Sequence, residues 1–212
     1  MADVKLVFYC NAKYIEYPPW LTRPAEIDDY PVDFAITLDR NATKLQAELF
    51  LLSVSGFECF THDFGADVAT LLAENEPGGF VVSGGIVFWD TEHEIRPGCC
   101  SGVENWRESM ETVEAGESPF MGHDPWPGIT YKGERVFVWQ EGPLLPGEEG
   151  RKAPALSNAV TFDRKELLQK LRELGETNLR EFLEGPFRTR MRELDATQAD
   201  PLLRALMLSM RV

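Results

Sequence analysis

Two neighbouring thiols and a nearby histidine are the residues of this chain best suited to chemistry. Cys99 and Cys100 precede a predicted helix, and His123 and Asp124 follow in a segment rich in glycine and proline. Free N–H groups and the dipole at a helix N-terminus stabilise a thiolate, so a lowered thiol pKa is expected there. His123 or His93 would then be the base for a nucleophilic or redox-sensitive cysteine. An inert pair, with one thiol buried and the other in a turn, is the simpler alternative.

Metal binding is a second use for the same residues. Cysteine, histidine and aspartate are all metal ligands, and His62 and Asp63 add to those near Cys99. The spacing opposes this interpretation, because the sequence has no Cys-x-x-Cys or His-x-x-x-His pair and adjacent cysteines seldom chelate one ion. We therefore expect no bound metal and no cofactor, and we assign no catalytic residue.

Aromatic and acidic residues close to the thiols suit a binding surface. Trp106, Trp126 and Trp139 could line a ligand groove, and acidic residues on a helix face attract a basic partner. The alternative is architectural, with the tryptophans in the core and an Arg107–Asp124 ion pair that holds the loop on the helix. The predicted binding residues are Trp106, Arg107, Glu108, Glu111, Glu114 and Trp126.

A block of the sequence resembles a group of small uncharacterised bacterial proteins. The block spans residues 97–125 and consists of Pro97-Gly98-Cys99-Cys100-x-Gly102, then Trp106-Arg107, then Gly122-His123-Asp124-Pro125. With flanking strands that end in Trp89 and Trp139, the resemblance covers roughly residues 80–140. No activity is established for the group, so the resemblance implies a shared scaffold and assigns no chemistry.

Charge is distributed unevenly along the 212 residues. Residues 1–150 carry 26 acidic and 9 basic side chains, a net charge of −17, whereas residues 151–212 carry 9 acidic and 12 basic, a net charge of +3. An acidic surface repels phosphate backbones and attracts cations, which excludes direct nucleic-acid binding and favours a basic protein partner. Acidity also keeps a bacterial protein in solution, and that is the simpler explanation.

Cysteine usage and hydropathy indicate the compartment. Four cysteines, two of them adjacent, do not resemble the disulfide framework of a secreted domain, so reduced thiols are expected. The sequence shows no basic leader and no run near the roughly 18 apolar residues of a spanning helix. We expect a cytoplasmic protein with no membrane contact.

Alternating apolar residues predict strands over residues 4–10 and 32–38. Residues 45–54 fit both a strand and a helix, and we favour a strand; residues 67–74 predict a short helix. Glycine-containing turns predict two hairpins, over residues 80–89 through Ser83-Gly84-Gly85 and over residues 129–139 through Lys132-Gly133-Glu134.

The helix between the two predicted hairpins has the clearest signals. Ser101 followed by Glu104 is a capping box, apolar residues recur every three or four positions, and Gly116 ends the helix. The sequence therefore predicts an α+β fold, in which an antiparallel sheet built from hairpins has a helix packed on one face and is followed by a C-terminal helical segment.

Composition divides the chain into an acidic α+β body (1–140), a Pro/Gly-rich linker (141–160) and a helical C-terminal segment (161–212). In that segment Asp163 with Glu166 predicts a capped helix, Gly175 its end, Gly185-Pro186 a break, and Asp200-Pro201 the start of the last helix. Its charge and leucine faces predict that the segment docks on the body or on a second copy of the chain.

These observations favour a non-enzymatic acidic binding or inhibitor protein, such as a bacterial immunity protein that neutralises a basic toxin. One alternative is a thiol- or metal-dependent enzyme centred on Cys99, Cys100 and His123. A second alternative is a structural module that self-associates through its C-terminal helices. Because no assembled catalytic motif is present, we do not expect enzymatic activity.

Overall fold

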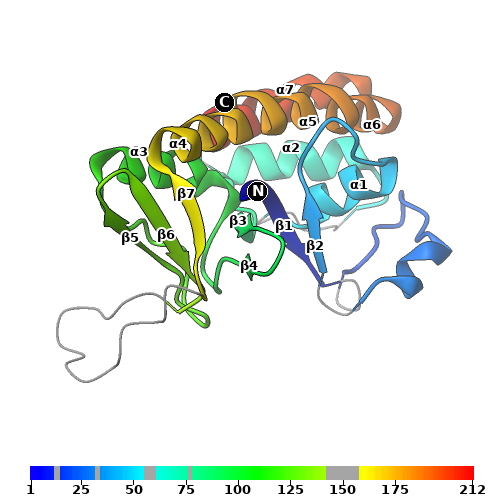
Figure 1. Cartoon of the computed structure of the whole chain (residues 1–212). Helices are drawn as coiled ribbons and strands as arrows, with labels where there is room; N and C mark the ends of the chain where they lie inside the picture. Colours follow the sequence, from blue (N-terminus) through cyan, green and yellow to red (C-terminus); the bar gives the residue numbers. More distant parts are fainter. Residues whose placement is uncertain (12–14, 32–33, 55–60, 76–77, 142–157) are drawn as a thin grey trace.

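Two antiparallel sheets lie beneath a layer of helices contributed mainly by the C-terminal part of the chain (Figure 1). This computed structural model describes residues 1–11, 15–31, 34–54, 61–75, 78–141 and 158–212. The α+β fold class predicted from the sequence is confirmed. Within the described residues, no helix combines the length and the apolar character needed to cross a membrane.

The larger sheet has the strand order β2-β1-β3-β4. In the first strand Leu6, Phe8 and Cys10 are buried as the alternation predicts, but Val7 on the opposite face is buried as well and Val4 is only half-buried. The predicted strand over residues 32–38 corresponds to β2, although its first two residues lie outside the described ones. The four strands are β1 (Asp3–Cys10), β2 (Phe34–Thr37), β3 (Gly84–Trp89) and β4 (Glu94–Ile95).

The predicted hairpin over residues 80–89 is wrong. Gly84 and Gly85 do not form a turn but lie inside β3, which pairs with β1 on one side and β4 on the other. A Cβ atom at Gly84 would collide with the carbonyl oxygen of Val7, and its φ is +154°. Glycine is therefore required here because two backbones approach closely, a requirement that resembles a turn signal in the sequence.

The smaller sheet has the order β5-β6-β7. Its first two strands are the predicted hairpin over residues 129–139, which is confirmed. The third strand begins at Val160, at the end of the predicted linker; residues 142–157 of that linker lie outside the described residues. The strands are β5 (Gly128–Lys132), β6 (Arg135–Trp139) and β7 (Val160–Asp163).

The predicted strand over residues 45–54 is wrong, because this run forms helix α1 (Lys44–Leu52). Thr43 Oγ1 accepts a hydrogen bond from the Gln46 N–H, and Gln46 Oε1 accepts one from the Thr43 N–H. This capping box fixes the helix start. Consecutive residues from Ala47 to Leu51 are buried, so no helical period is visible in the sequence. The next helix, α2 (Phe64–Glu74), starts three residues before its predicted boundary.

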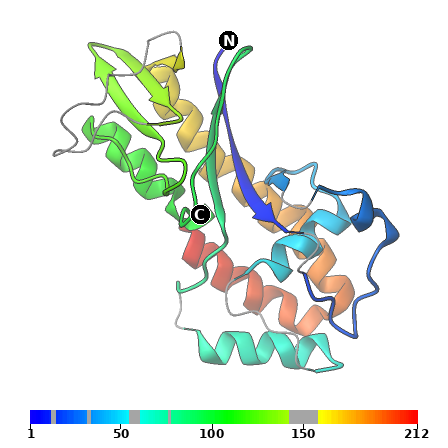
Figure 2. The ribbon, with the colours of Figure 1, turned by 90° about the horizontal axis from the view of Figure 1, so that it is seen from below.

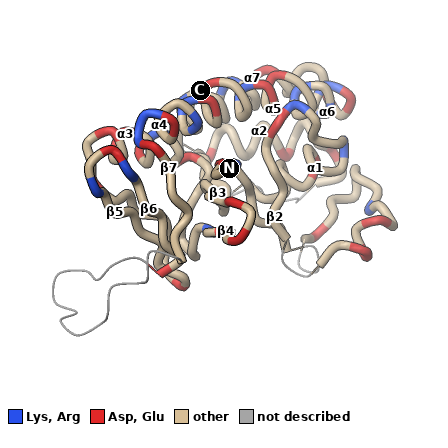
Figure 3. Tube along the Cα trace, in the orientation of Figure 1, with Lys and Arg blue, Asp and Glu red and all other residues tan. Residues whose placement is uncertain are grey.

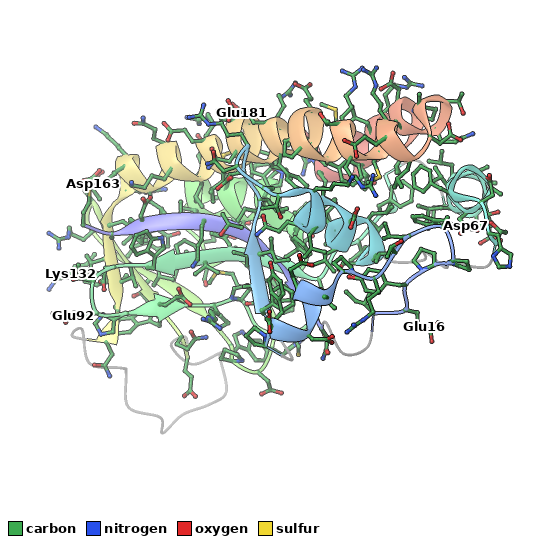
Figure 4. All side chains as sticks on the ribbon, turned by 90° about the vertical axis from the view of Figure 1, so that its right-hand side faces the viewer. Glu16, Asp67, Glu92, Lys132, Asp163 and Glu181 are labelled. Atoms are coloured by element: carbon green, nitrogen blue, oxygen red, sulfur yellow. The ribbon has the colours of Figure 1, made fainter. Side chains whose placement is uncertain are left out.

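The C-terminal segment forms one long helical rod followed by α7. Asp163, which is labelled in Figure 4, caps α4 as predicted and accepts hydrogen bonds from the N–H groups of Lys165 and Glu166. Gly175 and Gly185-Pro186 do not end the rod, because both lie within π-helical turns through which the helix continues. The rod contains α4 (Arg164–Glu173), a π turn (Leu174–Leu179), α5 (Arg180–Phe182), a second π turn (Leu183–Phe187) and α6 (Arg188–Leu194).

The last helix, α7, spans Ala196–Met210 and starts earlier than predicted. Asp195 is its N-cap, and Pro201 lies inside the helix instead of opening it. Rings from both parts of the chain meet in one core, where Phe50 of α1 contacts Phe182 and Phe187 at centroid distances of 5.0 and 5.5 Å. The C-terminal helices therefore share one apolar core with the described residues of the preceding α+β part of the chain.

Candidate functional site

The predicted capping box before helix α3 (Trp106–Ala115) does not form. Glu104 Oε2 accepts a hydrogen bond from the Val82 N–H at 3.2 Å, and Ser101 makes no cap. A short 3₁₀ turn at Val103–Asn105 precedes the helix instead. The helix N-terminus is therefore several residues away from the two thiols, and the predicted cause of a lowered thiol pKa is absent.

A β-bridge holds Cys99 beside His123. The Cys99 N–H donates to the His123 carbonyl at 2.6 Å, and the His123 N–H donates to the Cys99 carbonyl at 2.8 Å. Next to the bridge, a Cβ atom at Gly98 would collide with the carbonyl oxygens of His123 and Pro125. The backbones of residues 97–100 and 122–125 are thus closely paired, which explains the glycines in both segments.

The bridge gathers three side chains with metal-ligating atoms. The ligand atoms of Cys99, Cys100 and His123 all lie within 4.8 Å of one another, and the two Sγ atoms are 3.9 Å apart. Both thiols are free and exposed. Their hydrogen bond, together with repulsion from a Cys99 thiolate, raises the pKa of the Cys100 thiol above its ordinary value. Asp124, the fourth candidate residue, is exposed, has a φ of +41°, and precedes Pro125 through a cis peptide bond.

Two exposed aromatic rings flank the imidazole of His123. Phe120 and Trp126 contact it edge to face, at centroid distances of 5.0 and 4.8 Å. Their exposed fractions are 49% and 43%, so Trp126 offers the accessible surface that its predicted binding role requires. Phe120 is a site residue that the sequence analysis missed, and its position between Pro119 and the His123 segment gave no signal of exposure.

The predicted acidic residues Glu108, Glu111 and Glu114 are exposed on α3, and Figure 3 marks the acidic positions of this helix. Glu108 and Phe120 line a small pocket of about 60 Å³ together with Asn105, Ser109 and Pro119. Glu111 pairs with Arg211 at 3.2 Å, in an ion pair about half exposed on both sides. We call Glu108, Glu111, Glu114, Phe120 and Trp126 the acidic-aromatic face. Of its three carboxylates, those of Glu108 and Glu114 have no ion-pair partner among the described residues.

The other two predicted binding residues, Trp106 and Arg107, turn toward the C-terminus of the chain. Trp106 is buried, and its Nε1–H donates to the Met210 carbonyl at 2.6 Å. Arg107 lies over the Trp106 ring and donates from Nε to the Arg211 carbonyl at 3.1 Å. The proposed Arg107–Asp124 ion pair is not formed. Figure 2 shows the C-terminus beside the start of α3, so these residues position the site and offer little surface to a partner.

The remaining predicted ligands lie elsewhere. His93 is in the turn before β4, where its Nδ1 is 3.4 Å from Asp90 Oδ1, and His62 is exposed beside the cap of α2. A larger pocket of about 670 Å³, with Trp20 and Tyr30 among its lining residues, lies over the buried Glu48–Arg190 ion pair and was not predicted. The sequence gave no signal for it, since its walls come from three separated segments.

Comparisons with protein-family models, with curated proteins and with solved structures found no match to this chain. The resemblance to small bacterial proteins therefore stays a prediction. The predicted site residues contribute to two exposed features, a thiol–imidazole cluster and the acidic-aromatic face.

Proposed function

We propose that this protein is a non-enzymatic, cytoplasmic binding protein whose acidic-aromatic face receives a basic segment of another protein, as an immunity protein receives a basic toxin. The observation that carries the proposal is the position of Phe120, 49% exposed, which lines a pocket with Glu108 and contacts the imidazole of His123; Trp126, 43% exposed, contacts the same imidazole. Exposed aromatic side chains surrounded by charge are typical anchors of protein interfaces.

The local charge favours a cationic partner. Residues 101–124 contain six acidic side chains and one basic side chain, Arg107. Because Arg107 is directed to the Arg211 carbonyl, it does not neutralise the carboxylate of Glu108. An arginine of the partner can stack on Phe120 and pair with Glu108, which line the same pocket, and so combine a cation–π contact with a charge-assisted hydrogen bond.

Self-association through the C-terminal helices has less support. Their apolar faces are already used within the chain, since Leu167, Leu171, Leu203 and Leu206 are all buried. On α7 only Leu208 remains a widely exposed large apolar residue, with 57% of its surface accessible. One leucine is too small a patch for a stable interface, so the acidic-aromatic face is the better candidate.

Capture from a lysate of the source cells tests the proposal when it includes matched variants. The immobilised full chain should retain a basic protein, and the double variant Glu108→Lys/Glu114→Lys should lose it. The control Glu181→Lys/Glu184→Lys makes the same charge change at exposed positions of the helical rod (Glu181 is labelled in Figure 4) and should retain the partner. Retention by all three chains, or by none, would contradict the proposal.

A further inference from the structure

We propose that Cys99, Cys100 and His123 form a binding site for a single Zn²⁺ ion, with two thiolates and one imidazole as protein ligands. The site does not depend on the proposed binding function. It replaces the expectation from sequence spacing that no metal is bound, because the three ligands come together only through the pairing of residues 98–99 with residues 121–123.

Backbone geometry places the three side chains on one side. Residues that face each other in an antiparallel pair project from the same face, so Cys99 and His123 point in a common direction. Neighbours in an extended chain project to opposite faces. Cys100 departs from that rule because its φ of +64° is left-handed, and its Sγ consequently lies 3.9 Å from that of Cys99.

The spacing of the ligand atoms fits tetrahedral zinc. Two Zn–S bonds of about 2.3 Å at a tetrahedral angle place the sulfur atoms about 3.8 Å apart. The observed distance is 3.9 Å. Zinc with one sulfur and one nitrogen ligand needs a separation of about 3.6 Å, and all three ligand atoms already lie within 4.8 Å of one another. Small side-chain rotations therefore complete the geometry without backbone movement.

The surroundings hold the ligands in place before an ion arrives. Phe120 and Trp126 both contact the His123 ring edge to face, and these contacts restrict its rotation. Gly122, with a φ of +95°, leaves no room for a side chain against the Cys99 carbonyl. Tyr9 donates from its hydroxyl to the Pro97 carbonyl at 3.1 Å, which ties the cysteine segment to β1. Such support lowers the cost of ordering the ligands on binding.

The chemistry of the site specifies the ion. Two sulfurs and one nitrogen form a soft donor set that suits zinc and disfavours magnesium or calcium. Three protein ligands leave the fourth tetrahedral position for water, and both thiols are open to solvent. The six acidic residues at 101–124 add a local field that attracts a divalent cation.

Titration of the reduced, metal-free full chain tests the site. One equivalent of Zn²⁺ should bind, and Co²⁺ in its place should show thiolate-to-cobalt charge transfer and the absorption of tetrahedral cobalt. Zinc should also protect Cys99 and Cys100 from iodoacetamide, read out by mass mapping, while Cys10 is unaffected. Circular dichroism of each variant shows whether the fold is kept.

Substitutions then assign the ligands. Cys99→Ser, Cys100→Ser and His123→Asn should each weaken zinc binding by at least about tenfold, whereas His62→Gln, far from the cluster in sequence, should leave it unchanged. Absence of stoichiometric binding, an octahedral cobalt spectrum, or unchanged affinity in Cys99→Ser would overturn the proposal. Binding of Cu⁺ but not Zn²⁺ by the same residues would overturn the choice of ion.

Discussion

The indole of Trp106 lies directly against the backbone of Gly175, in the space that a Cβ atom at position 175 would occupy. Trp106 starts α3, and Gly175 lies in the first π turn of the helical rod. The same indole donates its N–H to the Met210 carbonyl at the end of α7. One buried side chain thus joins α3, which carries the acidic-aromatic face, to both parts of the C-terminal segment.

Gly175→Ala should destabilise the protein, because the added methyl group must displace a packed ring. Overpacking a core costs about 1–3 kcal/mol, and the better helix propensity of alanine offsets up to about 1 kcal/mol of it. Gly185→Ala is the matched control, since no atom lies within 4 Å of its ideal Cβ position. Thermal unfolding should show a lower Tm for the first variant and an unchanged or higher Tm for the second. Equal shifts would contradict the packing argument.

Gly175, Gly84 and Glu104 show where prediction from the sequence ends. Local signals worked where local contacts decide the structure, as at the Asp163 cap and the 129–139 hairpin. In the sequence Gly175 indicates a helix end and Gly84 a turn. In the structure each glycine is needed because a distant segment approaches its backbone. The position of Glu104 fits a capping box, but its carboxylate accepts a hydrogen bond from the Val82 N–H instead. Tertiary contacts of this kind leave no periodic trace in the chain.

Some features of the candidate site can likewise be predicted from the sequence, and others depend on tertiary contacts. The exposed glutamates of α3 follow from their residue type, whereas the exposure of both Cys99 and Cys100 does not, because a free cysteine is usually buried. The approach of His123 to the thiols depends on a bridge between segments more than twenty residues apart, and the left-handed φ of Cys100 has no signature in a non-glycine residue. Spacing rules for metal sites therefore gave no sign of the cluster.

The buried Glu48–Arg190 ion pair should show strong coupling. The Arg190 Nε–H donates to Glu48 Oε1 at 2.5 Å, and side-chain exposures are 11% for the arginine and 5% for the glutamate. Arg190→Met leaves the buried Glu48 carboxylate without its cation, at a cost of about 3–5 kcal/mol. Glu48→Met should cost less, because Arg190 keeps its ion pair with Glu193 at 2.9 Å. The double variant should lose much less. Urea unfolding of all four proteins measures the coupling, and additive losses would contradict it.

Glu104 should weaken the fold at neutral pH. Burial raises the pKa of its carboxyl above the ordinary value of 4.5. The protonated carboxyl therefore does not destabilise the fold at low pH, whereas the buried carboxylate that forms as pH rises lowers the free energy of unfolding. Glu104→Gln keeps an acceptor for the Val82 N–H and loses the charge. The variant should therefore gain stability relative to the wild type between pH 4 and pH 7, as measured by urea unfolding.

Asp200 is a control for Glu104, because its effect on stability changes with pH in the opposite direction. Hydrogen bonds from Arg188 and Arg192 lower the pKa of its carboxyl to about 2. Its contribution to stability is present above its unfolded pKa of about 3.8 and is lost as pH falls toward 2. Asp200→Asn should consequently lose stability relative to the wild type as pH rises from 3 to 7. A Glu104→Gln variant with the same pH trend as Asp200→Asn would contradict the assignment of burial as the cause.

Thiol reactivity should separate the cysteines by burial. Cys10 lies in the core, and burial raises the pKa of its thiol to about 12, whereas Cys99 is exposed. Iodoacetamide at neutral pH should alkylate Cys99 long before Cys10, which should react only after unfolding. Cys59 lies outside the described residues. Mass mapping that finds Cys10 labelled at the rate of Cys99 in the native protein would contradict this order.

The most direct test of the central claim is the salt dependence of the association rate with the captured basic partner. If the acidic-aromatic face steers the encounter, the wild-type rate should fall as ionic strength rises past about 0.15 M, where the Debye length is about 8 Å, while dissociation changes less. Glu108→Lys/Glu111→Lys/Glu114→Lys should associate slowly at low salt and lose most of this dependence. A variant that associates at the wild-type rate at low salt would show that the partner binds elsewhere.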